Sequence, residues 1–85
     1  MTSRDYDSAV AVILITTEPG CEQDVVTQLQ SIPEIDEVIL LFGEYDIFAK
    51  IKCSDFGVLS DVVVNKIRNI SGIESTKTLT AAPML

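Results

Sequence analysis

The sequence predicts an α+β domain with the element order βαββαβ, and three features of the chain carry this prediction. The continuous apolar run Ala9–Ile15 is rich in β-branched residues and has the length of a buried strand. Two later segments repeat apolar residues every three or four positions, as amphipathic helices do. Between these segments, two apolar strand-length runs are joined by a short stretch that contains Gly43, which is typical of a hairpin.

The first strand leads into a helix through turn-forming residues. Thr16–Gly20 brings a proline and a glycine together after the apolar run. A helix is expected over Cys21–Ser31, with Glu22 and Asp24 in its first turn, where the helix dipole favours acidic side chains. Its apolar face consists of Val25, Leu29 and Ile32. Pro33 ends the helix because proline lacks the N–H that a further helical hydrogen bond requires.

The second half of the chain repeats this pattern. Strands are expected over Ile35–Phe42 and Asp46–Cys53, and the second of these alternates apolar and polar residues more clearly. A helix follows, with its N-cap at Ser54–Asp55, and extends to Ile70. After a serine and a glycine, Ile73–Ala82 is expected to form the fourth strand.

Two βαβ halves joined by a hairpin describe a ferredoxin-like fold, a four-stranded antiparallel sheet with two helices on one face. The helices share a face because β-α-β crossovers are right-handed. The opposite face is then bare, yet consecutive residues in the first two expected strands are apolar, as in strands buried on both faces. Soluble monomers avoid so large an apolar patch. We therefore expect residues 1–85 to form one domain that assembles at least into a homodimer, sheet against sheet.

Charge and composition exclude several classes of partner. The net charge is −7 and lysine and arginine form no cluster, so direct nucleic-acid binding is not expected. No apolar run is long enough to cross a bilayer and the acidic N-terminal residues are unlike a secretory signal, so we expect a cytoplasmic protein without a membrane partner. Cys21 and Cys53 lie far apart and no histidine completes a zinc set. They are expected to be packing residues, with no metal and no cofactor.

The usual machinery of an enzyme is missing from the sequence. Without histidine, the commonest general base is absent, and so are Ser/His and Cys/His nucleophile pairs. No glycine-rich phosphate-binding loop is present. We expect no catalytic residues. The enzymatic alternative is a dimeric α+β barrel, an architecture that also pairs ferredoxin-like sheets.

A binding site at the hairpin and the last strand is the remaining possibility. Backbone amides at the Gly43 turn can bind a small carboxylate, Asp46 can pair with an ammonium, and Tyr45 can form an apolar wall with a polar tip. Thr76 and Thr78 point to one face of the last strand and can orient the same ligand. The alternative is a solvated hairpin beside an edge strand, in which threonine is simply common.

The expected sheet order, 4-1-3-2, separates the two parts of this candidate site. The hairpin belongs to one edge of the sheet, and Thr76 and Thr78 belong to the opposite edge. A ligand that contacts both would need two subunits, so binding would be linked to assembly.

The same residues resemble the effector domain of the Lrp/AsnC family, also called the RAM domain. Phe42–Ile51 (FGEYDIFAKI) is similar to its hairpin signature, in which a glycine, an acid, an aromatic residue and an aspartate precede apolar residues and a lysine. Gly72–Thr78 (GIESTKT) resembles the start of the family's last strand, and Glu18–Gly20 resembles its first strand-to-helix junction. The resemblance covers Ala9–Ala82, with three motifs in order.

This resemblance implies the βαββαβ fold, dimers that pack through their sheets, and association of dimers into octamers or decamers. It also implies small-molecule effectors, usually amino acids, bound between dimers. Gly43, Tyr45 and Asp46 match the hairpin part of that pocket, and Thr76 and Thr78 match the strand part.

Full-length members of the family carry a helix-turn-helix before this domain, whereas only residues 1–8 precede the first expected strand. The resemblance is therefore to the short, stand-alone form found mainly in archaea, and it implies action on transcription through full-length relatives. Three hypotheses stay open: an amino-acid sensor, a structural oligomerisation module without a ligand, and the barrel enzyme. The identity of the effector also stays open, because Glu44 fits both a pocket for a basic side chain and an exposed turn.

Overall fold

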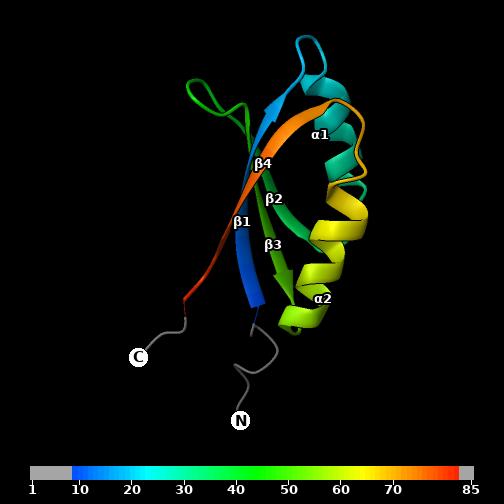
Figure 1. The fold of residues 1–85 in the computed structure, drawn as a ribbon, viewed down its shortest axis with the longest axis vertical. Coiled ribbons are helices and arrows are strands. Elements are labelled where there is room, and N and C mark those ends of the chain that lie inside the picture. The colour runs from blue at the N-terminus through cyan, green and yellow to red at the C-terminus, as the bar shows by residue number, and fades with distance from the viewer. Residues whose placement is uncertain (1–8, 83–85) are drawn as a thin grey trace.

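The computed structural model describes residues 9–82 and shows one four-stranded sheet covered by helices on one face (Figure 1). In chain order the elements are β1 (Ala9–Thr17), α1 (Glu22–Gln30), β2 (Ile35–Leu40), β3 (Ile47–Cys53), α2 (Phe56–Asp61) with its continuation η2 (Val62–Ile67), and β4 (Ile73–Thr80). The strand order is β2-β3-β1-β4 and all pairs are antiparallel. These findings confirm the ferredoxin-like βαββαβ prediction.

The central strand β1 sets the register of the sheet. Ile13 lies opposite Ala49 of β3 on one side and opposite Thr78 of β4 on the other. The pairing with β4 shifts between Thr16 and Thr17, at the end of the strand. Residues that lie opposite each other share a face of the sheet, so this register decides which side chains meet the helices.

The core lies between the sheet and the helices, and strand alternation places its residues there. Every second residue of β1 is buried, and the residues between them are half-exposed on the other face. The largest fully buried side chains are Ile13, Ile15, Leu29, Ile47, Ile51, Ile67, Val25 and Val62. A thin core of this kind, under a single helical layer, leaves one face of the sheet uncovered.

The uncovered face is apolar at its centre, as expected. Val12 and Leu14 of β1 are half-exposed there, and Ile39 and Leu79 of the edge strands expose 42% and 47% of their surface. Both helices lie on the opposite side of the sheet in Figure 1. The structure holds a single chain, so the sheet-to-sheet dimer remains a prediction.

The second helix differs from the single α-helix expected up to Ile70. Asp55 caps it as predicted, since its Oδ1 accepts a hydrogen bond from Val58 N at 2.9 Å. From Val62 the helix widens to π geometry, and Arg68 N donates to Val63 O at 3.1 Å. Three consecutive valines, 62 to 64, crowd a regular α-helix because their branched side chains meet the preceding turn.

Apart from the end of the second helix, the element boundaries differ from the expected ones by at most two residues. β1 extends through Thr17, beyond the expected Ile15, and β2 ends at Leu40 rather than Phe42.

Cys21 is half-buried and Cys53 is buried, and both thiols are free. Within residues 9–82 no helix is long and apolar enough to cross a membrane.

Candidate functional site

The hairpin between β2 and β3 is anchored to the central strand as well as to its own strands. Leu41 N donates to Asp46 O at 2.9 Å and closes the turn, and Asp46 N donates to Ile15 O at 2.9 Å. At the tip, Gly43 has φ +128°, a positive value that glycine adopts readily in a tight turn. The connection projects beyond the sheet (Figure 1).

Asp46 also binds β1 through its side chain. Its Oδ2 accepts a hydrogen bond from Thr17 N at 2.8 Å and another from Thr17 Oγ1 at 3.3 Å. Thr17 is only 6% exposed and is the one buried polar residue in the part of the chain that the structure describes. A buried N–H needs a partner, and the carboxylate supplies it.

A cavity of about 320 Å³ lies beside the base of this hairpin. Its lining consists of Glu22, Leu40, Leu41, Phe42 and Asp46. The three apolar residues form a wall, and the two acids come from different elements, α1 and the hairpin. An apolar cavity with a few convergent polar groups is the usual form of a small-molecule site.

Glu22 is the member of this cavity that sequence reasoning missed. It was interpreted as a first-turn acid that favours the helix dipole, and it does occupy the first turn of α1. Its place beside the hairpin follows from the packing of α1 on the sheet, which has no signature in the local sequence.

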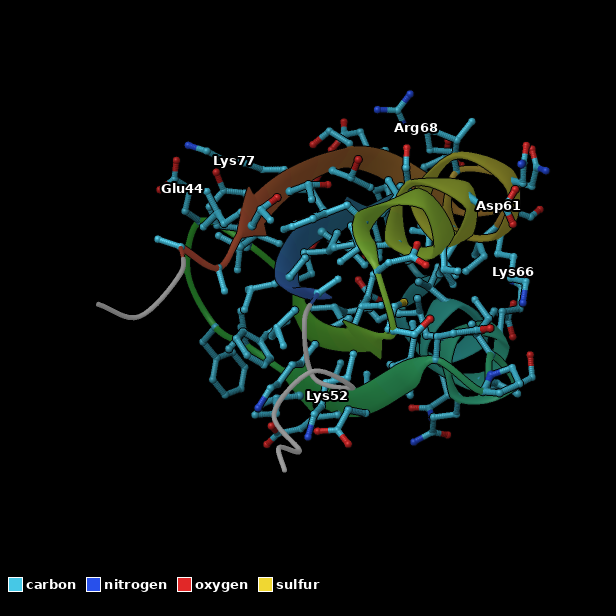
Figure 2. All side chains as sticks on the ribbon, turned by 90° about the horizontal axis from the view of Figure 1, so that it is seen from below. Glu44, Lys52, Asp61, Lys66, Arg68 and Lys77 are labelled. Carbon is cyan, nitrogen blue, oxygen red and sulfur yellow. The ribbon has the colours of Figure 1, made fainter. Side chains whose placement is uncertain are left out.

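The other predicted hairpin residues do not line the cavity. Gly43 and Glu44 are exposed and Tyr45 is half-buried. In Figure 2, Glu44 lies with Lys77 on the side of the sheet away from the helices, whereas Arg68 lies on the helical side. Of the predicted hairpin residues, only Asp46 lines this cavity.

Thr76 and Thr78 lie on the helical face of β4, because they pair with the buried Ile15 and Ile13. Thr78 lines a groove of about 490 Å³ between α2–η2 and β4. The other lining residues of this groove are Phe56, Leu59, Ser60, Val63, Val64, Arg68 and Thr80. Of the predicted site residues, Asp46 and Thr78 therefore line two separate hollows of one chain.

The expected separation of these two clusters needs one correction. The sheet order is as predicted, but Asp46 bonds to Ile15 and Thr17 of β1 rather than staying at the β2 edge. Since Ile15 pairs with Thr76, only β1 lies between Asp46 and β4. Asp46 reaches β1 because it directly precedes β3, the strand that pairs with β1.

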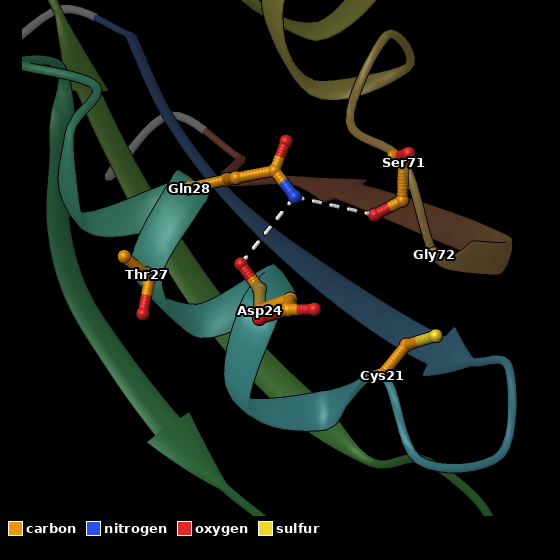
Figure 3. A pocket seen from close by; sticks show the side chains of 6 residues that line it. All are labelled: Cys21, Asp24, Thr27, Gln28, Ser71 and Gly72. Carbon is orange, nitrogen blue, oxygen red and sulfur yellow. Dashed lines mark hydrogen bonds between the residues drawn. The ribbon is translucent and has the colours of Figure 1, made fainter.

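A third groove lies between α1 and the loop before β4 (Figure 3). It is lined by Cys21, Asp24, Thr27, Gln28, Ser71 and Gly72. Gln28 Nε2 donates to Ser71 O at 3.3 Å and to Asp24 O at 3.4 Å, so the amide joins the helix to the loop. Because the polar groups of this groove are used in hydrogen bonds that hold the fold together, the groove is a weaker candidate for a ligand site.

No cluster that could hold a metal ion is found among residues 9–82.

The fold and the hairpin cavity together define a class of protein. A βαββαβ sheet with helices on one face and a small, partly apolar cavity at a glycine hairpin is typical of a small-ligand-binding domain. The chain belongs to the Lrp/AsnC family: residues 10–82 match the Lrp/AsnC ligand binding domain. The relatives that match this domain are named as transcription regulators.

Two relatives illustrate the family. The chain is 36% identical over 69 residues to an uncharacterized HTH-type transcriptional regulator of Pyrococcus abyssi, covering 81% of this chain and 44% of the relative. It is 32% identical over 74 residues to the regulatory protein AsnC of Escherichia coli, covering 87% of this chain and 49% of the relative. The chain therefore spans about half the length of these regulators.

Solved structures share the fold. A hypothetical protein from Pyrococcus horikoshii superposes with a TM-score of 0.83 at 32% identity, covering 89% of this chain and 92% of that one. A transcriptional regulator of Neisseria meningitidis, solved in complex with L-Met, superposes with a TM-score of 0.84 at 16% identity, covering 98% of this chain and 56% of that one. The second likeness concerns the fold alone.

Proposed function

We propose that this domain binds an amino-acid effector and modulates transcription by assembling with Lrp/AsnC chains, rather than by contacting DNA itself. The observation that carries the proposal is the cavity beside the hairpin, in which Asp46 meets an apolar wall within a domain of a ligand-binding family. The complex of the Neisseria meningitidis regulator with L-Met supports the ligand class.

The ligand roles follow from the chemistry of the predicted residues. Asp46 binds the α-ammonium group, and the backbone amides of the Gly43–Glu44 turn bind the α-carboxylate. Tyr45, which is half-buried and lies outside the cavity of one chain, borders the ligand where dimers meet. Thr76 and Thr78 of a neighbouring protomer orient it, since in their own chain they lie on the far side of β1.

Assembly occurs first through the uncovered face of the sheet. Val12, Leu14, Ile39 and Leu79 supply the apolar surface that a second copy covers, giving a dimer. Association of dimers into an octamer or decamer then forms the ligand sites between them. In this proposal residues 1–85 act as one RAM-type domain in the cytoplasm, where transcription is regulated.

The partners that transmit the signal are full-length Lrp/AsnC regulators. The chain carries 13 acidic and 6 basic residues, a balance that opposes binding to phosphates. Mixed assemblies with related chains that carry a helix-turn-helix would bring the effector response to DNA. This step rests on the shared family of the ligand binding domain.

A thermal-shift screen of the purified protein against the twenty amino acids at millimolar concentration tests the proposal. A ligand at one hundred times its dissociation constant adds about 2.7 kcal/mol of stability, which is easily measured. Asp46→Asn is the informative variant, because its amide oxygen can still accept the bonds from Thr17 while its charge is lost. We expect a shift with one or a few amino acids that this variant abolishes; a flat panel would contradict the proposal.

A structural oligomerisation module is the second candidate, and one observation favours it. The hydrogen bonds of Asp46 to Thr17 and Ile15 give that residue a role in the fold without any ligand. Under this alternative the oligomer forms to the same extent with and without amino acids. Sedimentation velocity in both conditions separates the two candidates.

A further inference from the structure

We infer that Glu22 sets the side-chain specificity of the hairpin cavity, and that the cavity prefers amino acids with a cationic side chain to neutral ones of the same length. The inference rests on the proposed function, because it names the class of amino acid that the same cavity takes. It starts from the juxtaposition of the first turn of α1 with the hairpin, which brings Glu22 and Asp46 to one cavity.

The charges of the lining all have one sign. The only ionisable side chains that line the cavity are the carboxylates of Glu22 and Asp46. No lysine or arginine lines it, so no side chain of the cavity can balance a second negative group on a ligand. A ligand with one ammonium group satisfies one carboxylate, whereas a ligand with two cationic groups satisfies both.

The two carboxylates are held differently, and this suggests a division of roles. Asp46 Oδ2 accepts two hydrogen bonds from Thr17, which fix the orientation of the short side chain. Such a fixed carboxylate suits the α-ammonium group that all amino acids share. Glu22 is half-buried, and its side chain makes no hydrogen bond or ion pair with another residue in the described range 9–82. The carboxylate oxygens of Glu22 can therefore accept hydrogen bonds from the side chain of the ligand, the part that varies between amino acids.

The apolar wall fits the rest of such a ligand. Leu40 and Leu41 offer surface to a methylene stem, and the ring of Phe42 is fully exposed beside them. Lysine and arginine stems lie along apolar surface while their charged heads reach polar groups. A cationic head near the Phe42 ring also gains a cation–π attraction, which a neutral side chain lacks.

Glu22 carries this role better than Glu44, the acid that the sequence associated with a basic side chain. Glu44 is exposed at the turn and does not line the cavity. Figure 2 places it on the side of the sheet away from the helices. Glu22 lies far before Glu44 in the chain and is brought to the cavity by the packing of α1 on the sheet.

The test compares L-lysine with L-norleucine, which has the same carbon stem without the terminal ammonium group, and includes cadaverine, which keeps both amines and lacks the carboxylate. Isothermal titration measures each affinity for the wild-type protein and for Glu22→Gln. Asp24→Asn is the matched control, because it removes an acid from the same helical turn and lines the groove of Figure 3 instead.

We expect lysine to bind more tightly than norleucine, and Glu22→Gln to weaken lysine binding about tenfold, the usual weight of one charge-assisted hydrogen bond. Norleucine affinity stays unchanged in Glu22→Gln, and Asp24→Asn behaves as wild type. Equal binding of the two amino acids, or lysine binding that survives Glu22→Gln, overturns the inference and leaves the proposed function standing. Binding of cadaverine without binding of any amino acid supports the cation preference of the cavity and overturns the amino-acid function.

Discussion

The Thr17 backbone N–H lies 2.8 Å from Asp46 Oδ2, which joins the end of β1 to the hairpin across 29 positions of sequence. The threonine hydroxyl reaches the same oxygen at 3.3 Å. The aspartate that the sequence assigned to ligand binding is therefore also the residue that ties the hairpin to the sheet. Removing the Asp46 side chain would act on both roles, so the contribution of this contact to the stability of the fold is better measured by changing Thr17.

Replacing Thr17 by valine tests this tether. Valine has nearly the same shape and keeps the backbone bond, but it removes the hydroxyl bond to Asp46. We expect a loss of about 1 kcal/mol in the free energy of unfolding, measured by urea denaturation. Thr17→Ser keeps the hydroxyl and should retain more of the stability. A valine variant as stable as wild type would show that the hydroxyl contributes nothing.

Any side chain at position 72 is expected to lower the free energy of unfolding. Its φ is +95°, and a Cβ built there would lie 2.9 Å from the Cβ of Cys21 and 3.2 Å from Val25 Cγ2. Gly72→Ala should cost about 2–4 kcal/mol, because left-handed strain and overpacking against the start of α1 add together. Gly20→Ala is the control: its φ is +82° with nothing within 4 Å, so only strain of about 1–2 kcal/mol applies. Equal losses for the two variants would rule out the contact with Cys21.

Much of the fold could be predicted from local patterns. The apolar run at β1 predicts a strand, and the helical spacing that ends at Pro33 predicts a helix. Gly43 likewise predicts a turn. Each of these signals lies within a few residues of sequence. The strand order then follows from the ferredoxin-like fold, and the handedness of the crossovers places both helices on one face. Asp55 was likewise recognised as a helix cap because capping is a local interaction.

The candidate site could be predicted only in part, because its contacts join distant segments. Thr17 stands in a stretch with turn composition, and it becomes part of β1 because it pairs with Ile73. Glu22 reaches the hairpin cavity through helix packing, and the π segment from Val62 arises from crowding that a periodicity of 3.6 does not express. These features depend on tertiary contacts, which override local preference.

The ion pair between Glu34 and Lys66 predicts a small dependence of stability on pH. Lys66 Nζ lies 3.1 Å from Glu34 Oε1, and this hydrogen bond is the main reason that the pKa of Glu34 is lowered from its usual 4.5. A lowered pKa stabilises the folded state above the unfolded pKa, and this contribution is lost as the pH falls through the folded pKa. Because the pair is largely exposed, we expect Glu34→Gln to cost at most about 1 kcal/mol at pH 7.

The difference between wild type and Glu34→Gln should shrink as the pH is lowered below about 4.5, and it should also shrink in high salt. Urea denaturation at several pH values measures it. Asp36→Asn, which removes an exposed acid nearby without breaking this ion pair, is the control. A Glu34→Gln difference that grows toward acid pH would contradict the assignment.

The two thiols should react at different rates. Cys53 is buried in β3, and burial, with smaller effects of the Glu34 and Asp55 carboxylates, raises the pKa of its thiol. Only a thiolate attacks Ellman's reagent, so Cys53 should react slowly in the folded protein and rapidly in urea. Cys21 is half-buried and should supply the faster phase. The variant Cys21→Ser should remove that phase; two fast thiols in the folded state would contradict the packing of β3.

The uncovered face of the sheet gives the sharpest test of assembly. Leu14 lies at its centre, opposite Phe48 and Lys77 of the neighbouring strands. Leu14→Arg places a charge beside Lys77 in the apolar surface that a second copy would cover, and burying an unpaired charge is costly. We expect sedimentation equilibrium to show a dimer or larger oligomer for wild type and a monomer for the variant. Val64→Arg is the control, since Val64 is 47% exposed on the helical side, away from this face. If Leu14→Arg associates as wild type does, or if both variants are monomers, the sheet face is not the dimer interface.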